Sequence, residues 1–550
     1  MLVAFALRLY RLADANVWWD EGWTLWLSRF DLASIAVRTA RDEHPPLHYW
    51  LVHFWNSVAG GDASTDAFVG RFFSVFFGVL TVAVVYRVVK RFGGANLGAL
   101  VALGLALARF HIWWSQDIKN YTLSGFFAWG AVWFALEILL ADTSGSSKAS
   151  AGQWGPISGY ILAMTLALYS HYLAALILFA VNIFAVITLI RVRFQEPASP
   201  LAKRGNRSLQ LFVYWSLAQV GVLVLFAPWL YLYLQNAATW TAAPAFDFGL
   251  FLQLAATVLP LGITTNIESY VLPTLALTVI ALLAGLWLFQ PARLNVNPSR
   301  RSSFSSLSLF AFLVVSVPPL LIYVLSLTPA SFFAPKIQAR YLLILLPGYL
   351  ILLALGLVLL ARWSKYLGAL AGLFVLVLQV WTLGDYYQAR VLRDEYFTLA
   401  KVVNSFALDG DVVLLHTDQE YPTYLYYHRA RIGWTGVPNA TPVSDKDALD
   451  LVNYLTERFD GVWLVTIPNA LVQDPQHLVE QKLAAKFPRQ FERTFGDKRL
   501  TLFARTVHNL KDVPHENFHS QEPRNDEFAS DLRLIGFDLP VRQARGGEAL

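Results

Sequence analysis

The sequence predicts a polytopic α-helical membrane protein with a small C-terminal α/β domain, and three observations lead to this fold class. Hydrophobic residues make up 56% of the 550 residues, charged residues only 15%, and the mean hydropathy is +0.45. Soluble domains are closer to a quarter charged. Apolar runs of 18 or more residues recur, as in membrane-spanning helices. Near residue 385 the composition changes to that of a soluble α/β domain.

The apolar runs place the spans. The first run, MLVAFAL, is short and meets Arg8 and Arg11 at once, so we expect its helix to begin upstream of Met1 or to be shortened. We predict about eleven spans, at residues 1–12, 67–88, 95–112, 120–140, 157–171, 173–190, 210–233, 270–290, 305–326, 341–361 and 366–384.

The basic residues indicate the topology. Lys and Arg concentrate in alternate loops, for example RVVKR at 87–91 and ARWSK at 361–365. Such loops are cytoplasmic by the positive-inside rule. With an odd number of spans, the outer segments are then residues 13–66, 110–119, 234–269, 327–340 and everything after 385. The 19 tryptophans fit interfacial anchors.

We predict three regions: a transmembrane domain at 1–384, an extracytoplasmic α/β domain at 385–508 and a disordered polar tail at 509–550. In the second region GDVVLLH (410–416) and GVWLVT (461–466) are typical of buried strands, and RLTLFART of a closing strand. DKDALDLVNYLTERF and PQHLVEQKLAAKF have helical periodicity. The tail has few large apolar residues.

Charge and cysteine content exclude several functions. The net charge of +5 is spread over short loops, where it sets topology, so we expect membrane lipids as partners and no nucleic acid. The absence of cysteine excludes disulfides, thiolate catalysis and cysteine metal sites.

Unusual polar residues fall on the predicted outer face. WWDEGWT places Asp20 and Glu21 in the first outer loop, and DEHPPLHYW adds Glu43 and His44 beside a Pro-Pro turn. Further candidates lie at the outer ends of later spans, namely Arg71, Asp117, Lys119, Tyr121, His171, Lys336, Arg340 and Tyr341.

Each motif also has a structural explanation. A loop DE pair is usually solvated, Pro-Pro is usually a rigid turn, and a histidine between spans is usually a satisfied polar group. Asp117 and Lys119 fit an interfacial ion pair of little energetic value. Lys336 and Arg340 fit cations that snorkel to the interface. Their shared side of the membrane favours a functional interpretation.

These residue types suit glycosyl transfer from a lipid-linked donor. Cations at the interface bind a lipid phosphate, and Arg does so with planar bidentate donors. A carboxylate accepts a proton from a hydroxyl or amine nucleophile. Phosphate is a good leaving group, so one base plus cationic stabilisation is sufficient. Direct displacement inverts the anomeric carbon.

The motifs RLYRL, WWDEGWT, EHPPLHYW, SQDIKNY, SHY and ARYLLILLPGYLILLALG, in this order, resemble the GT-C membrane glycosyltransferases. The pattern is most similar to the protein O-mannosyltransferase-like group and the lipid A aminoarabinose transferase, over about residues 5–390. The resemblance implies a GT-C fold, a polyprenyl-phosphate-linked sugar donor and a protein, lipid or glycan acceptor. It also implies a plasma (inner) membrane location with an extracytoplasmic active site.

The resemblance assigns roles to individual residues. Asp20 matches the catalytic base and Glu21 its support. Glu43 and His44 match an acidic–basic pair near the donor phosphate, with His here instead of Lys. Arg340 matches a phosphate ligand.

The sequence departs from the family pattern at two positions of one later motif. SQDIKNY has Asp117 and Lys119 where the family's S-x-E-A-R-x-Y has Glu and Arg. Lys offers a point charge instead of a fork. We expect Lys336 and Lys119 to assist Arg340 at the phosphate.

Three alternatives stay open. A transporter or flippase of lipid-linked sugars would carry ionisable residues near mid-membrane, which the sequence does not show. An inactive scaffold would use the outer domain to bind a partner. A divalent cation (Mg²⁺ or Mn²⁺) would have Asp20, Glu21 and Glu43 as hard oxygen ligands. The outer segment NAATWTAAPAFDF is a candidate lid, and the C-terminal domain a cover or acceptor selector.

Overall fold

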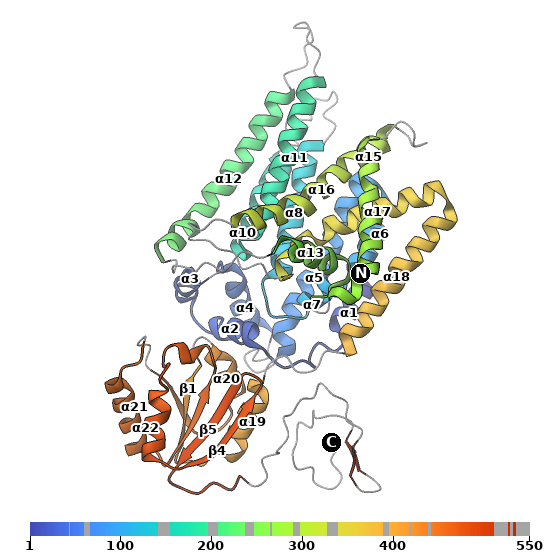
Figure 1. Cartoon of the computed structure of the whole chain (residues 1–550). Helices are drawn as coiled ribbons and strands as arrows, with labels where there is room; N and C mark the ends of the chain where they lie inside the picture. Colours follow the sequence, from blue (N-terminus) through green and yellow to red (C-terminus); the bar gives the residue numbers. More distant parts are fainter. Residues whose placement is uncertain are drawn as a thin grey trace. The chain divides into compact units, whose positions relative to one another are not determined.

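The computed structural model forms two compact units (Figure 1). The first comprises Met1–Leu12, Ser28–Gly61 and Phe68–Tyr387, and the second Ala13–Leu27, Asp62–Ala67 and Gln388–Leu550. The structure describes residues 1–42, 44–59, 67–140, 154–195, 207–236, 247–264, 267–289, 298–326, 339–388, 395–417, 420–437, 442–510, 526–528 and 532–534.

The first unit is helical and confirms a multi-pass membrane protein. Among its described residues, eight helical segments are long and apolar enough to cross a membrane, or nine if the bent pair α6–α7 forms one span. These are α5 (Ala67–Gly93), α6 (Ala95–Leu107) with α7 (Arg109–Ser115), α8 (Tyr121–Leu140), α11 (Ala174–Gln195), α12 (Arg207–Asn236), α14 (Val271–Leu282) between η1 (Ile267–Tyr270) and η2 (Leu283–Gly285) and followed by α15 (Leu286–Phe289), α16 (Pro298–Ser326), η3 (Ala339–Leu345) with α17 (Leu346–Trp363), and α18 (Lys365–Gln388).

The prediction of about eleven spans is therefore confirmed only in part. The two other predicted segments are shorter helices, α10 (Trp154–Ser170) and α1 (Leu2–Leu9). With eight residues, α1 is about 12 Å long and cannot cross a bilayer alone. The predicted outer loops also contain helices, namely α3 (Leu32–Ala40), α4 (Leu47–Val58) and α13 (Phe248–Leu261).

Helix α17 lies at the centre of the first unit. In its apolar window, which includes η3, 94% of the residues are buried. Gly356 permits α17 to approach α14 closely, because a Cβ at this position would lie 1.8 Å from the Ile280 carbonyl oxygen. Trp129 of α8 donates from Nε1 to the Ile344 carbonyl at 3.0 Å. Helix α17 and its η3 turn are thus fixed by packing and by a hydrogen bond.

The second unit contains a mixed five-stranded sheet in the order β2-β1-β3-β5-β4. Strands β2 and β3 run parallel to β1, whereas β5 runs antiparallel to β3 and to β4. The strands are β1 (Asp411–His416), β2 (Gly433–Gly436), β3 (Gly461–Thr466), β4 (Arg489–Phe495) and β5 (Lys498–Ala504). The predicted strands at 410–416 and 461–466 and the closing strand are confirmed.

Helices cover both faces of this sheet (Figure 1). Val413 and Leu415 face the core formed with α19 (Tyr396–Phe406) and α20 (Tyr421–Tyr427). Val412 and Leu414 face the core formed with α21 (Asp445–Arg458) and α22 (Leu478–Lys486). Every residue of β1 is buried, as expected for a strand covered on both sides.

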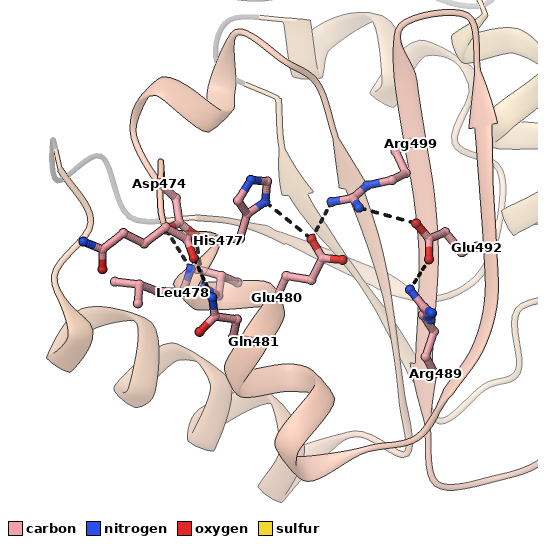
Figure 2. A network of polar contacts seen from close by, with 10 residues as sticks. Asp474, His477, Leu478, Glu480, Gln481, Arg489, Glu492 and Arg499 are labelled. Carbon is pink, nitrogen blue, oxygen red and sulfur yellow. Dashed lines mark hydrogen bonds and ion pairs between the residues drawn. The ribbon is translucent and has the colours of Figure 1, made fainter.

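Polar contacts complete the second unit. The Asp411 carboxylate accepts hydrogen bonds from the Trp463 indole at 2.9 Å and the Leu408 amide at 2.9 Å, and its Oδ2 lies 2.7 Å from His508 Nε2. Figure 2 shows a second network in which the Asp474 carboxylate accepts from the Leu478 amide at the start of α22.

The same figure shows an ion-pair chain that joins α22 to strands β4 and β5. Glu480 lies 3.7 Å from His477 and also pairs with Arg499, which reaches Glu492 at 3.4 Å (Figure 2). Partly exposed pairs of this kind add little stability.

The predicted disordered tail at 509–550 lies mostly outside the described residues. Those that are described include the short antiparallel pair β6 (Asp526–Phe528) and β7 (Leu532–Leu534).

Candidate active site

The predicted catalytic carboxylates stand on a helix of the second unit instead of in an open loop. Asp20 and Glu21 occupy the first turn of α2 (Trp19–Leu27). Carboxylates are favoured there because the positive end of the helix dipole stabilises negative charge. Both are buried: Asp20 is 6% exposed and Glu21 0%. Asp20 is therefore the more accessible of the two.

Helix α2 is fixed by close packing against α20. A Cβ at Gly22 would lie 2.9 Å from the Thr423 Cα, so only glycine permits this approach. The rings of Trp26 and Tyr421 meet edge to face at 5.5 Å, and the Tyr427 hydroxyl donates to the Val17 carbonyl at 2.9 Å. Contacts with α20 within the second unit thus set the position of the two carboxylates.

In the first unit, the rings of three predicted site residues gather around a fourth, His171, which follows α10. The ring centroid of His171 lies 5.4 Å from that of His44, 5.4 Å from that of Tyr121 and 6.4 Å from that of Tyr341. His44 Nδ1 lies 3.8 Å from a carboxylate oxygen of Asp42. Residues more than a hundred positions apart in the sequence therefore form one cluster.

The cations Arg340 and Lys119 border this cluster. The Arg340 guanidinium lies 6.0 Å from the ring centroid of Trp114, which packs at 4.8 Å against Tyr121. Lys119 is 2% exposed. Both cations and His44 act electrostatically on His171. Two cations, Arg340 and Lys119, therefore border the cluster, and Asp42 contributes a carboxylate beside His44.

His171 is held as a neutral hydrogen-bond donor. The Leu173 amide donates to its Nδ1 at 3.0 Å. Burial lowers the pKa of His171 well below 6.5, and the neighbouring His44, Lys119 and Arg340 lower it further. In the neutral ring the proton must then sit on Nε2. That buried Nε2 has no hydrogen-bond partner among the described residues.

Backbone contacts position the turn that carries Lys119. The Asn120 side chain donates to the Ser170 carbonyl at 2.8 Å, which ties this turn to the residue before His171. The Ser74 hydroxyl of α5 donates to the Lys119 carbonyl at 3.4 Å.

Sequence reasoning missed a supporting network centred on Arg8. Helix α6 breaks at Ala108, where the chain bends by 60° before α7. The break deprives the Leu105 and Ala106 carbonyls of helical partners. Fully buried Arg8 donates to both, at 3.1 and 3.2 Å.

Arg8 also reaches α7 directly. Its guanidinium contacts His111 Nδ1 at 2.9 Å and donates to the Ser115 hydroxyl at 3.2 Å. The Gln116 side chain donates back to the Arg8 carbonyl at 2.8 Å, and the Tyr386 hydroxyl donates to Gln116 Oε1 at 2.9 Å. This network fixes the start of the 116–121 turn. An arginine inside the apolar run that opens the chain was its only sequence signal.

Three further polar residues of the first unit are buried. Arg71 of α5 is buried and donates to the Leu12 carbonyl at 2.9 Å. Asp117 is fully buried in the 116–121 turn. Burial lowers the pKa of His48 in α4 to about 3, and Lys119 and His44 contribute to the shift.

Some predicted site residues lie outside the described part of the chain, namely Glu43, Lys336 and most of the candidate lid NAATWTAAPAFDF. Among the residues that are described, no group of three or more His, Asp or Glu side chains could hold a metal ion.

Residues 43–232 match the model of the family described as dolichyl-phosphate-mannose-protein mannosyltransferase. The match covers His44, Lys119, Tyr121 and His171, but not Asp20. It confirms the predicted resemblance and the enzyme class. No curated protein sequence matches the chain.

Solved structures match the chain over different shares of its length. ArnT from Cupriavidus metallidurans in the apo state matches with a TM-score of 0.57 and 13% identity, over 91% of this chain and 96% of that chain. This likeness shows the fold. The Archaeoglobus fulgidus oligosaccharyltransferase tethered with an acceptor peptide has a TM-score of 0.47 and 12% identity, over 85% and 68% of the chains. The S. cerevisiae Pmt1-Pmt2 complex bound to the sugar donor has 0.33 and 18%, over 46% and 36%.

Proposed function

Because residues 43–232 match the model of the family described as dolichyl-phosphate-mannose-protein mannosyltransferase, we propose that this chain is an inverting glycosyltransferase at the outer face of a plasma (inner) membrane. It takes a sugar from a polyprenyl-phosphate donor and transfers it to a protein, lipid or glycan acceptor. The observation that carries the proposal is the buried, neutral His171 ring, whose N–H has no partner among the described residues and on which the cations Lys119 and Arg340 act electrostatically.

The cluster around His171 binds the donor phosphate. A buried N–H without an acceptor is costly, and a phosphate oxygen would satisfy it. Arg340 and Lys119 supply the charge that a phosphate requires, and Arg adds a bidentate fork. His44 and Tyr341 line the same cluster. Lys336, four residues before Arg340 in the sequence, is a further candidate ligand.

Asp20 is the general base. The acceptor hydroxyl or amine attacks the anomeric carbon on the side opposite the phosphate, while Asp20 takes its proton. The bond from the anomeric carbon to the phosphate oxygen breaks, and polyprenyl phosphate leaves with the electron pair. Glu21 follows Asp20 in the sequence and is fully buried, and we assign it the role of supporting the base. The cationic cluster stabilises the charge that develops on the departing phosphate.

The side of the membrane on which the site lies is inferred from the charge distribution, and a role in acceptor selection is assigned to the second unit. The Lys and Arg residues in alternate loops support an outer location for Asp20, His44 and His171. Within the second unit, α20 positions α2. We assign to the second unit the additional task of selecting the acceptor.

The test is sugar transfer by the purified full chain, offered a panel of radiolabelled polyprenyl-phosphate sugars and candidate acceptors. Asp20→Asn keeps the size of the side chain and removes the base. Asp31→Asn is the matched control, because Asp31 caps α3 and Asn caps a helix equally well. We expect transfer by wild type and Asp31→Asn, and loss of transfer with donor binding retained in Asp20→Asn.

Two outcomes would contradict the proposal. Equal transfer by Asp20→Asn and wild type would remove Asp20 as the base. Donor binding without transfer by either protein, together with lipid flipping in vesicles, would favour a transporter. A parallel reaction with a chelator reports whether Mg²⁺ or Mn²⁺ takes part.

A further inference from the structure

An open groove of the first unit lies between α5, α8 and α10. Its volume is about 420 Å³. Among the described residues that line it, Arg87 of α5 is the one charged side chain, and the apolar ones include Phe126, Phe127, Trp133, Phe134 and Leu162. Leu162 is 58% exposed and Arg87 is exposed as well, so the groove is accessible from the surface of the unit.

The two ends of the groove differ in chemistry. At one end the Arg87 guanidinium lies 4.8 Å from the Trp133 ring centroid, and a Cβ at Gly159 would lie 2.6 Å from the Phe134 ring. Toward Phe126 the described lining is apolar throughout. From Phe134 back to Phe126, α8 rises by about 12 Å. The groove therefore has a cationic end and an extended apolar floor, as a site for an amphiphile requires.

The charge of Arg87 is not neutralised by a neighbouring acid. Arg91, one turn further along α5, pairs with Glu137 at 2.9 Å. In the described part of the chain, Arg87 contacts the Trp133 ring instead and pairs with no carboxylate. Stacking occupies a face of the planar guanidinium and leaves the N–H donors, which lie in its plane, for an anion.

We propose that this groove binds an anionic phospholipid, with the lipid phosphate on Arg87 and an acyl chain along the apolar floor. Basic pockets between membrane-spanning helices bind anionic lipid headgroups in this way. Exposed Lys90, just beyond the cationic end, adds positive potential. The RVVKR segment at 87–91 is predicted to be cytoplasmic by the positive-inside rule, so the lipid belongs to the inner leaflet.

Other amphiphiles fit the groove less well. A zwitterionic phospholipid brings a cationic group toward Arg87. A polyprenyl phosphate has suitable chemistry, but its proposed phosphate site is the cluster around His171, which includes Tyr121 at the start of α8. Trp133 lies about 18 Å further along that helix. A donor held in the cluster therefore cannot place the same phosphate on Arg87.

Two pairs of variants separate the headgroup contact from the acyl contact. Arg87→Gln removes the cation of the groove, and Lys90→Gln removes the same charge from the same helix end without altering the lining. Gly130 lines the groove, and a Cβ there would meet only the Ala163 Cβ, at 3.9 Å, so Gly130→Leu extends into it. Gly384→Leu is its control, because a Cβ at Gly384 meets no atom within 4 Å and Gly384 does not line the groove.

The experiment uses the full chain in phosphatidylcholine nanodiscs at about 150 mM salt, where long-range attraction is screened. The probes are phosphatidylglycerol and phosphatidylcholine with a diazirine in one acyl chain. Labelled peptides are quantified by mass spectrometry relative to those of α18. We expect phosphatidylglycerol to label α8 and α10 about fivefold more than phosphatidylcholine in wild type, Lys90→Gln and Gly384→Leu.

Arg87→Gln should lose this preference and keep labelling by both lipids, whereas Gly130→Leu should lose labelling by both. Equal labelling by the two lipids in the wild type would overturn the proposal. An equal loss of preference in Arg87→Gln and Lys90→Gln would also overturn it, because attraction to the basic surface in general predicts that result. Unlabelled polyprenyl phosphate, added in an amount equal to the probe, should leave the labelling unchanged. Displacement of phosphatidylglycerol would assign the groove to the donor lipid instead.

Discussion

The contact between α17 and α14 makes a sharp prediction for Gly356→Ala. The new methyl group would lie 1.8 Å from the Ile280 carbonyl oxygen and 2.8 Å from its carbon. Both are backbone atoms of a helix, so no side-chain rotation relieves the overlap. Overpacking of this kind costs about 3 kcal/mol or more. Alanine returns about 1 kcal/mol through its higher helix propensity, which leaves a net loss of about 2 kcal/mol.

The assay is thermal unfolding in detergent, followed by size exclusion or tryptophan fluorescence. Gly372→Ala is the control, because a Cβ there meets no atom within 4 Å and only the propensity gain applies. We expect Gly356→Ala to lower the melting temperature by several degrees and Gly372→Ala to leave it unchanged or higher. A Gly356→Ala protein as stable as the wild type would refute the close approach of α17 to Ile280.

Three further predictions concern the supports of the candidate site. Arg8→Met leaves two carbonyls at the break of α6 without donors, and we expect destabilisation of about 2 kcal/mol or more, measured as a lower melting temperature. Tyr386→Phe removes one hydrogen bond to Gln116 and should cost about 1 kcal/mol in the same assay. Burial lowers the pKa of His48 to about 3 in the folded protein, whereas a histidine in the unfolded chain has a pKa of about 6.5. The unfolded chain therefore binds a proton that the folded protein excludes, and stability falls as the pH drops below about 6.5. At pH 5 the loss from His48 is about 2 kcal/mol. His48→Gln should remove this share of the acid sensitivity in melting curves recorded from pH 5 to 8, while the share from other buried histidines such as His171 remains.

The sequence predicted the long spans well because each is an extended apolar run. The predicted segment 341–361 corresponds to η3 and α17, and 366–384 to α18. The helices α2 and α13 were not predicted. Helix α2 is short and carries carboxylates and tryptophans that fit a loop equally well, and its helical state depends on packing against α20. Tertiary contacts of this kind leave no local periodicity.

The gathering of His44, Tyr121 and Tyr341 around His171 could be expected from their shared side of the membrane, and the structure brings their rings together. Their roles in catalysis stay predictions. The Arg8 network could not be inferred, because its acceptors are carbonyls freed by a helix break nearly a hundred residues away. Nothing in the residue types at that break marks it.

Affinity for polyprenyl phosphate tests the central claim most directly. His171→Phe keeps an aromatic ring and removes the N–H, and Arg340→Gln removes a cation near the start of η3. Arg362→Gln is the matched control, because Arg362 near the end of α17 lies 5.6 Å from the Trp287 ring much as Arg340 lies 6.0 Å from Trp114. A charge-assisted hydrogen bond is worth tenfold or more in affinity. We expect His171→Phe and Arg340→Gln each to weaken binding about tenfold and Arg362→Gln to bind like the wild type. Equal affinity in all four proteins would contradict the assignment of the His171 cluster as the phosphate site.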